Sequence, residues 1–325
     1  MDFKNKIILA PMVDVTDIAF RKVCTDHGAD IVYSQMIDAV AFDRGARKLA
    51  DFYDEKNVVA QFFGNDAKLI AKGAKAVEDK VIVVDLNLGC PRSNVVERKC
   101  GSYLMRYPSK IKAIIKELVK KVKVPVSVKI RAGYDKNNIN AVKIAKLCEK
   151  EGVSAIAVHG RARTVNYAFP VDYDIIKKVK ESVNIPVIGN GDIFNGEDAK
   201  RMFDNTKCDS VMVARGAIGN PAVFSQIKDY LDGKKEKMVS IVPNSSSTSE
   251  QSSELLKQSL RKARTKKKLF YEYLRYAKKY KIHFKSIRTQ AQWFTKGVKH
   301  GGEYRGMINS AETVDELKEV YELIG

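Results

Sequence analysis

The chain has 325 residues, 45% of them hydrophobic, which suffices for one large domain and a smaller one, and its formal net charge of +19 favours an anionic partner. Five scattered cysteines form no CxxC pair, so the sequence argues against a disulfide framework or a metal site and for a reducing compartment. No stretch approaches a membrane span, and the apolar run near the N-terminus is too short for a signal peptide, so we expect a cytoplasmic protein without a membrane partner.

Eight short apolar runs, each typical of a buried strand, recur along the first two thirds of the chain. They cover residues 7–10, 30–34, 58–62, 81–86, 126–130, 155–158, 186–188 and 210–213. The stretches between them, such as 110–123 and 139–151, space apolar residues three and four positions apart, which predicts helices. Eight strand–helix units predict an α/β fold, a (β/α)8 TIM barrel. A doubly wound sheet is the alternative, but its glycine-rich dinucleotide-binding turn is missing.

The last third of the chain differs in composition. Residues 240–254 are serine-rich with two aliphatic side chains, which is typical of a flexible connection. A basic helical run and a last helix over 314–324, with Thr313 as its N-cap, follow it. We therefore expect a barrel domain over 1–235, a serine-rich linker over 236–254 and a small all-α helical domain over 255–325.

The positive charge is concentrated in that last part. Residues 257–299 contain 15 Lys/Arg and one acid, Glu272, which leaves a net charge of +14. Such a field attracts a polyanion, and the aromatic residues interleaved with the charges suit a helical RNA-binding face. A membrane-surface patch or a merely lysine-rich surface is the alternative.

Functional groups of a (β/α)8 barrel gather where the strands end. Seven predicted strands end on polar, glycine or basic residues, and this predicts one shared ligand. The seven ends are Pro11-Met12, Gln61, Asn87, Lys129, His159, Asn190-Gly191-Asp192 and Ala214-Arg215-Gly216. Glycine-rich loops after the last two strands favour a phosphate, because backbone N–H groups can approach it closely and Arg215 adds a charged contact.

Lys129 and His159 end neighbouring strands. A lysine inside a barrel is costly unless an anion pairs with it. A reduced flavin is such an anion, since it carries negative charge near N1 and C2=O. A Schiff base at Lys129 is the alternative, and His159 could equally be a satisfied core histidine.

Two cysteines, Cys90 and Cys100, lie ten residues apart in a loop that follows the fourth strand. A thiol on such a loop is a candidate acid, nucleophile or metal ligand, and a small buried hydrophobe is the commoner alternative.

Six motifs in order resemble those of the tRNA-dihydrouridine synthases. They are APMVDVTD (10–17), the loop NLGCP…KCGSYLM (87–105), SVKIRAG (127–133), VHGRAR (158–163), IGNGDI (188–193) and ARGAIGNP (214–221). The resemblance runs from about residue 7 to 232 and resumes more loosely over 288–305, which looks like the family's helical tRNA-binding domain. It implies a flavin-dependent oxidoreductase that uses FMN and NADPH or NADH to reduce a uridine of tRNA to 5,6-dihydrouridine. The sequence leaves the oligomeric state open, and a monomer is our expectation.

The resemblance also implies roles for single residues. It places Pro11, Met12 and Val13 along the flavin, with Gln61 at the ring edge. It places Lys129 at the N1/C2=O side and His159 at the ring or phosphate side. The ribityl chain and phosphate would contact Asn190, Gly191, Asp192, Ala214 and Arg215. Asn87, Arg161 and Arg163 match positions near the uracil and the RNA backbone, and Cys100 matches the proton donor. A thiol with a pKa of about 8.5 is protonated at neutral pH and can give a proton to C5, which an ionised carboxylate cannot. Cys90, beside Pro91, fits a structural role better.

Two features depart from the family's pattern. Ala162 stands where many relatives have a hydroxyl residue, and the serine-rich link is long. Two other functions are compatible with parts of the sequence: a flavin barrel acting on a free pyrimidine, and an inactive tRNA-binding relative. The first explains neither the basic segment nor a helical domain, and the second does not explain why Cys100, Lys129 and His159 occur together.

Overall fold

The computed structural model describes residues 2–46, 50, 52–234 and 249–324. Its centre is a closed barrel of eight parallel strands, because β2 pairs with both β1 and β4 and the order continues through β5 to β9 back to β1. The strands are β1 (Ile7–Leu9), β2 (Ile31–Tyr33), β4 (Val58–Phe63), β5 (Val83–Leu88), β6 (Val126–Arg131), β7 (Ala155–His159), β8 (Val187–Asn190) and β9 (Ser210–Val213). Each coincides with a predicted apolar run, so the predicted barrel is confirmed. A two-residue strand, β3 (Ile37–Asp38), adds to the edge of β4.

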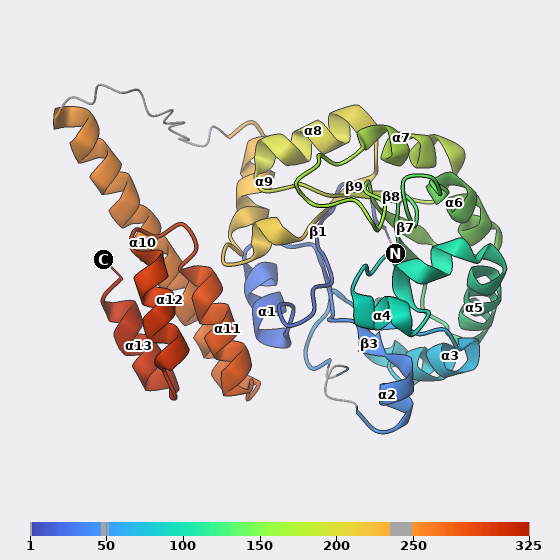
Figure 1. The fold of residues 1–325 in the computed structure, drawn as a ribbon, viewed down its shortest axis with the longest axis horizontal. Helices are drawn as coiled ribbons and strands as arrows, with labels where there is room; N and C mark the ends of the chain where they lie inside the picture. Colours follow the sequence, from blue (N-terminus) through green and yellow to red (C-terminus); the bar gives the residue numbers. More distant parts are fainter. Residues whose placement is uncertain (1, 47–49, 51, 235–248, 325) are drawn as a thin grey trace.

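Helices surround this barrel (Figure 1). They are α1 (Ile18–Asp26), α2 (Ala39–Asp43), α3 (Ala67–Lys75), α4 (Ser93–Glu97), α5 (Pro108–Lys121), α6 (Ala141–Lys150), α7 (Tyr173–Ser182), α8 (Gly196–Thr206) and α9 (Val223–Leu231), with 3-10 turns η2 (Glu78–Lys80), η3 (Gly101–Arg106) and η4 (Arg215–Ala217). Several begin at an Asp or Asn whose side chain accepts a backbone N–H of the first turn, as Asp66 does from Leu69 at 3.0 Å. These caps explain why the helices begin where they do.

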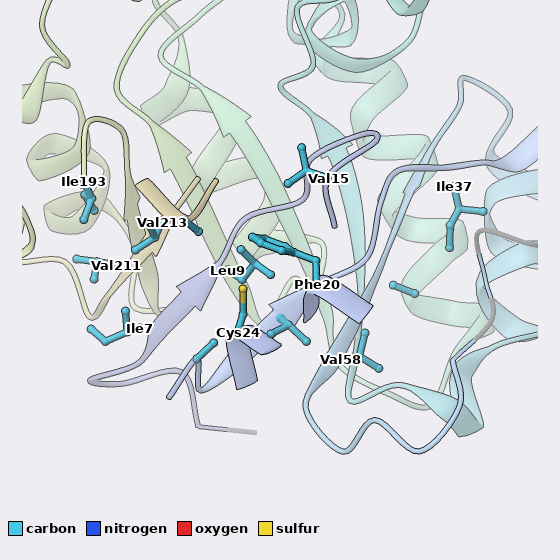
Figure 2. Close-up of a cluster of buried hydrophobic side chains, with 14 of the residues drawn as sticks. Ile7, Leu9, Val15, Phe20, Cys24, Ile37, Val58, Ile193, Val211 and Val213 are labelled. Carbon is cyan, nitrogen blue, oxygen red and sulfur yellow. The ribbon is translucent and has the colours of Figure 1, made fainter. Parts of the chain in front are cut away.

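Strand side chains alternate between two apolar layers. In β1, Ile7 and Leu9 pack in the layer that contains Phe20 and Cys24 of α1, whereas Ile8 packs in a separate layer made mainly of strand residues. Figure 2 shows the first layer between strands and helices. Because successive side chains of a strand point to opposite faces, the second layer fills the barrel. This apolar filling leaves the space for a ligand at the ends of the strands.

Four helices follow at the C-terminal end: α10 (Ser249–Lys279), α11 (Phe284–Phe294), α12 (Gly301–Ser310) and α13 (Val314–Glu322). They share a buried aromatic core in which Phe270 stacks on Tyr321 with ring centroids 3.9 Å apart. The N-cap predicted at Thr313 is present, since its Oγ1 accepts the N–H of Glu316 at 3.2 Å. In Figure 1 this helical group lies beside α1 and α9.

One expectation about the chain's organisation needs correction. The last six residues of the predicted serine-rich linker, 249–254, belong to α10 rather than to a flexible connection. Serine, glutamine and glutamate tolerate the first turns of a helix, so low hydrophobicity alone did not mark its start. Residues 235–248 lie outside the described residues, and the domain boundaries remain a prediction. Across the described part of the chain, no helix has the length and apolar character needed to span a bilayer.

Candidate active site

A cavity of about 420 Å³ opens at the C-terminal ends of the strands. Its walls come from the segments that follow β1, β5, β8 and β9, together with Lys129 and Arg131 of β6 and His159 of β7. Of the residues singled out from the sequence, the lining contains Pro11, Met12, Val13, Asn87, Lys129, His159, Asn190, Gly191, Asp192, Ala214 and Arg215. The barrel thus brings eleven of the fifteen candidate residues to one cavity. The other four, Gln61, Cys100, Arg161 and Arg163, lie elsewhere and are described below.

Lys129 is a half-buried cation in this cavity. Its Nζ donates to Oδ1 of Asn190 at 2.9 Å, and Asn190 is itself held by a 2.7 Å bond from its Nδ2 to the carbonyl of Met212. Burial, reinforced by the charge of Arg131, lowers the pKa of Lys129 to about 8. The ammonium therefore predominates at neutral pH, although its only hydrogen-bond partner among the described residues is a neutral amide.

His159 lies at the end of β7 with 6% of its surface exposed. Burial lowers its pKa far below the usual value, and the charges of Arg131, Lys129, Arg161 and Arg215 lower it further. The imidazole is therefore neutral at physiological pH. Its Nε2 lies 3.4 Å from Nη1 of Arg161, a geometry in which the guanidinium donates and the ring nitrogen accepts.

Asp192 anchors the loop that follows β8. Its Oδ1 accepts from Arg215 at 2.7 Å, and its Oδ2 accepts from Arg161. Arg161 also donates to the carbonyl of Phe169, and only 2% of Arg161 is exposed. The guanidinium predicted to lie near RNA is thus buried, where it ties the loop after β7 to the loop after β8.

Gly191 lies in the cavity wall, with little space around its backbone. Its φ of +129° is one that residues with a side chain rarely adopt. A Cβ at this position would lie 2.7 Å from Cγ2 of Val171 and 3.0 Å from Cδ2 of His159. Glycine therefore keeps the backbone of this loop next to the imidazole and open to a ligand.

A polar network lies beneath the cavity. Asp85 accepts from Oγ of Ser127 at 2.5 Å and from Nε2 of Gln61 at 2.7 Å, and Gln61 in turn accepts from Nδ2 of Asn87 at 2.8 Å. Gln61 is fully buried and does not line the cavity, but it is linked to the cavity wall through Asn87. Oδ1 of Asn87 accepts the backbone N–H of Cys90 at 2.9 Å, which positions the cysteine loop. Burial raises the pKa of Asp85 to about 6.

The two cysteines of this loop face different cavities. Cys90 lines the strand-end cavity, whereas Cys100 lines a neighbouring cavity of about 720 Å³ together with Asp38 and Arg98. Cys100 nevertheless belongs to one apolar cluster with Met36, Val13 and Cys90, all three of which line the first cavity. Burial raises the pKa of the Cys100 thiol to about 11. Its Sγ donates to the carbonyl of Arg98 at 3.2 Å.

Arg163, the remaining candidate, lies at the surface after β7, with its guanidinium 5.1 Å from the ring centroid of Tyr134.

Three further residues of the site were not singled out from the sequence: Asp85, Arg131 and Tyr167. The sequence could have identified Asp85, because it is an acid inside the apolar run of β5. It could also have identified Arg131, because it is a charged residue at the end of β6. Tyr167 lies on a long loop, where it contacts Arg131 Nη2 through its hydroxyl at 3.1 Å, and nothing in the sequence pattern marks it. No group of three His, Cys, Asp or Glu side chains in the described ranges could hold a metal ion.

The sequence model of the family described as "Dihydrouridine synthase (Dus)" matches residues 8–324. The chain belongs to the dihydrouridine synthase family. The tRNA-dihydrouridine synthase B of Pasteurella multocida (strain Pm70) is 39% identical over 234 residues, which is 70% of this chain and 70% of that protein. A probable tRNA-dihydrouridine synthase of Rickettsia prowazekii (strain Madrid E) is 42% identical over 243 residues, 73% of this chain and 74% of that protein.

A solved structure of 2-naphthoyl-CoA reductase with 2-naphthoyl-CoA has a similar fold, with a TM-score of 0.55 and 13% identity over 71% of this chain and 50% of that one. This likeness concerns the fold alone. Family membership confirms the resemblance read from the six motifs, and with it the prediction of a flavin-dependent oxidoreductase. The family model also extends over the helices α10 to α13, so the chain's basic end is part of the family's architecture.

Proposed function

We propose that this chain is a tRNA-dihydrouridine synthase, which reduces the C5=C6 bond of a uridine in tRNA with FMN as cofactor and NADPH or NADH as reductant. The observation that carries the proposal is the ammonium of Lys129, half-buried in a cavity of the family's barrel and bonded to a neutral amide. A buried cation without an anionic hydrogen-bond partner suits an electron-rich ligand. The names of the relatives support tRNA as the substrate.

The residues of the cavity fit FMN. The tight approach at Gly191 and the guanidinium of Arg215, held by Asp192, suit a phosphate at the β8–β9 side. Lys129 suits the N1/C2=O side of an isoalloxazine, and Met12 and Val13 provide apolar wall beside it. Bound there, FMN would supply the hydride that uracil C6 receives.

The electrostatics of the wall favour that chemistry. Lys129 would stabilise the negative charge of a reduced ring, and Arg131 adds a second positive charge to the same wall. His159 is neutral because of the cations around it, so it can accept or donate a hydrogen bond without adding charge. Asp85 and Gln61 hold Asn87, and Asn87 holds the cysteine loop against the cavity.

Cys100 is the proposed proton donor to C5. Addition of a hydride at C6 leaves an electron pair that a proton must neutralise at C5, and the two electrons come from the nicotinamide reductant. The raised pKa keeps the Cys100 thiol protonated at neutral pH, as a general acid requires. Its place in the cluster with Val13 and Met36 puts the thiol beside the cavity wall.

The cysteine pair provides a matched test. We expect Cys100→Ala to retain FMN and tRNA binding and to lose at least about 100-fold in dihydrouridine formation, in the usual range for removal of a general acid. Cys90→Ala, on the same loop, should keep most of the activity. Bound flavin is measured by absorbance and dihydrouridine by nucleoside analysis of the tRNA.

Undiminished turnover in Cys100→Ala, or loss in Cys90→Ala alone, would contradict the assignment. The same assay with free uridine in place of tRNA separates the alternative of a free-pyrimidine reductase. We expect tRNA to be strongly preferred, because free uridine makes no use of the basic helices α10 to α13. A protein that binds tRNA and FMN but forms no dihydrouridine would be the inactive relative.

A further inference from the structure

Three tyrosines from two loops meet at the rim of the barrel, outside the cavity. Tyr103 stacks on Tyr107 with centroids 5.2 Å apart and an interplanar angle of 30°. Tyr134, from the loop after β6, meets Tyr103 edge-on at 6.5 Å. All three rings are half-buried, so each keeps exposed surface. We call Tyr103, Tyr107 and Tyr134 the tyrosine platform.

Arg106 lies among the three rings. Its guanidinium carbon is 5.6 Å from the centroid of Tyr103, 5.7 Å from that of Tyr107 and 5.0 Å from that of Tyr134. The residue is exposed, and its side chain makes no hydrogen bond or ion pair with any described residue. The donors of the guanidinium therefore remain available to an external acceptor while its face contacts the rings.

Three more cations surround the platform. Arg163 lies over Tyr134 at 5.1 Å and Lys110 lies over Tyr107 at 5.5 Å. The hydrogen bond with Tyr103 lowers the pKa of Tyr107, and the charge of Lys99 adds a smaller effect in the same direction. Within the described part of the chain, none of the three side chains forms an ion pair. Unpaired cations around exposed aromatic rings match the composition of single-stranded nucleic-acid sites, where bases stack and phosphates are neutralised.

The platform lies across the barrel mouth from the basic helices. Tyr103 and Tyr107 follow β5 and Tyr134 follows β6, whereas α10 packs against α1, which follows β1. In the closed strand order, β6 is four strands from β1 in either direction, which is the opposite side. Figure 1 shows α5 and α6 at the side of the barrel away from α10 to α13. A ligand that touches both regions must span the mouth and pass over the cavity.

We propose that the tyrosine platform is a second tRNA contact, at which unpaired bases stack while Arg106 and its neighbouring cations hold the phosphates. This inference rests on the proposed function, because it takes tRNA as the substrate. The geometry favours a polymer over a small ligand, since the rings form an open rim surface and not an enclosed cavity. With α10 to α13 on one side and the platform on the other, the RNA is held at two points around the cavity that must receive its uridine.

Binding of unmodified tRNA to the FMN-loaded full-length protein tests the platform. We expect Tyr134→Leu to weaken tRNA binding roughly 5- to 150-fold, the range for loss of one stacked base, while Tyr134→Phe stays close to the parent protein. Arg106→Gln should also weaken binding, whereas Lys116→Gln, which removes one exposed charge from α5, should change it little. Flavin content and melting temperature show whether each variant is folded.

Fluorescence gives a second measurement, because the chain has one tryptophan, Trp293. Tyr134→Trp adds a reporter to the platform, and we expect tRNA to quench its emission beyond the change seen in the parent. Equal tRNA affinity of Tyr134→Leu and the parent, or no added quenching in Tyr134→Trp, would overturn the proposal and leave the platform to a protein partner or to loop structure. Failure of the parent enzyme to form dihydrouridine would instead refute the proposed function, which binding measurements do not probe.

Discussion

The cavity wall and the helices α10 to α13 are both rich in cations, but they use them differently. Two cations of the cavity wall have short-range partners: Lys129 bonds to Asn190, and Arg215 bonds to Asp192. On α10, Arg261 and Arg264 are exposed and line an open groove of about 390 Å³. Charges in a partly buried site are weakly screened by salt, whereas exposed charges are strongly screened and together attract a distant polyanion. The first arrangement suits a single bound anion, and the second suits a polyanion.

Hydrogen bonds join the helices α10 and α11 to loops of the barrel, and we call this contact region the seam. Tyr273 of α10 donates its hydroxyl to Oδ2 of Asp17 at 3.0 Å, and Nε2 of Gln290 on α11 donates to the carbonyl of Val15 at 2.7 Å. Lys266 donates to the carbonyl of Gly219 on the loop after η4. The helices therefore hold the β1 and β9 loops that form part of the cavity wall. The basic end of the chain is therefore also part of the barrel's support.

The largest effect should come from the cavity cation. We expect Lys129→Met to lower kcat/KM for tRNA reduction by about 10²- to 10³-fold, as for removal of one preorganised electrostatic group. Its folded pKa of about 8 lies below the ordinary value, so the ammonium is lost as pH rises through about 8. FMN affinity of the parent apoprotein should therefore fall above pH 8, and that of Lys129→Met should not. The same pH profile in both proteins would remove Lys129 from cofactor binding.

The second prediction concerns the stability that Asp17, at the seam, contributes at different pH values. Burial raises the pKa of Asp17 from 3.8 to about 6 despite bonds from Phe20 and Tyr273. A carboxyl whose folded pKa is raised favours folding most below its unfolded pKa, and this stability is lost as pH rises through about 6. Asp17→Asn lacks this loss, so relative to the parent its free energy of unfolding should rise by about 2–3 kcal/mol between pH 4 and 7. Urea unfolding at the two pH values measures this difference, and a pH-independent difference would contradict it.

The sequence predicted the strands well because their signal is local. Runs such as those of β4 and β6 are rich in β-branched residues, and the chain's order then places their ends at one rim. The sequence could not predict the position of a side chain that long-range hydrogen bonds decide. Arg161 is buried because Asp192 and the carbonyl of Phe169 receive it, and Gln61 turns to Asp85 beneath the cavity. The spacing of residues along the sequence does not reveal such partners, since they lie on other loops and strands.

The smallest predicted effect is that of a substitution at Arg264, on α10, on tRNA binding. This exposed residue makes no side-chain bond within the described ranges, so Arg264→Gln should change neither flavin content nor stability. It should weaken tRNA binding several-fold at low salt and reduce the slope of log affinity against log salt by about 1, the value for one lost phosphate contact. Arg264→Lys is the matched control, because it keeps the charge and should keep the slope. Parallel salt profiles for Arg264→Gln and the parent would mean that this groove does not touch RNA. In that case, the α10 cations would raise the general field around the molecule without marking where the RNA lies.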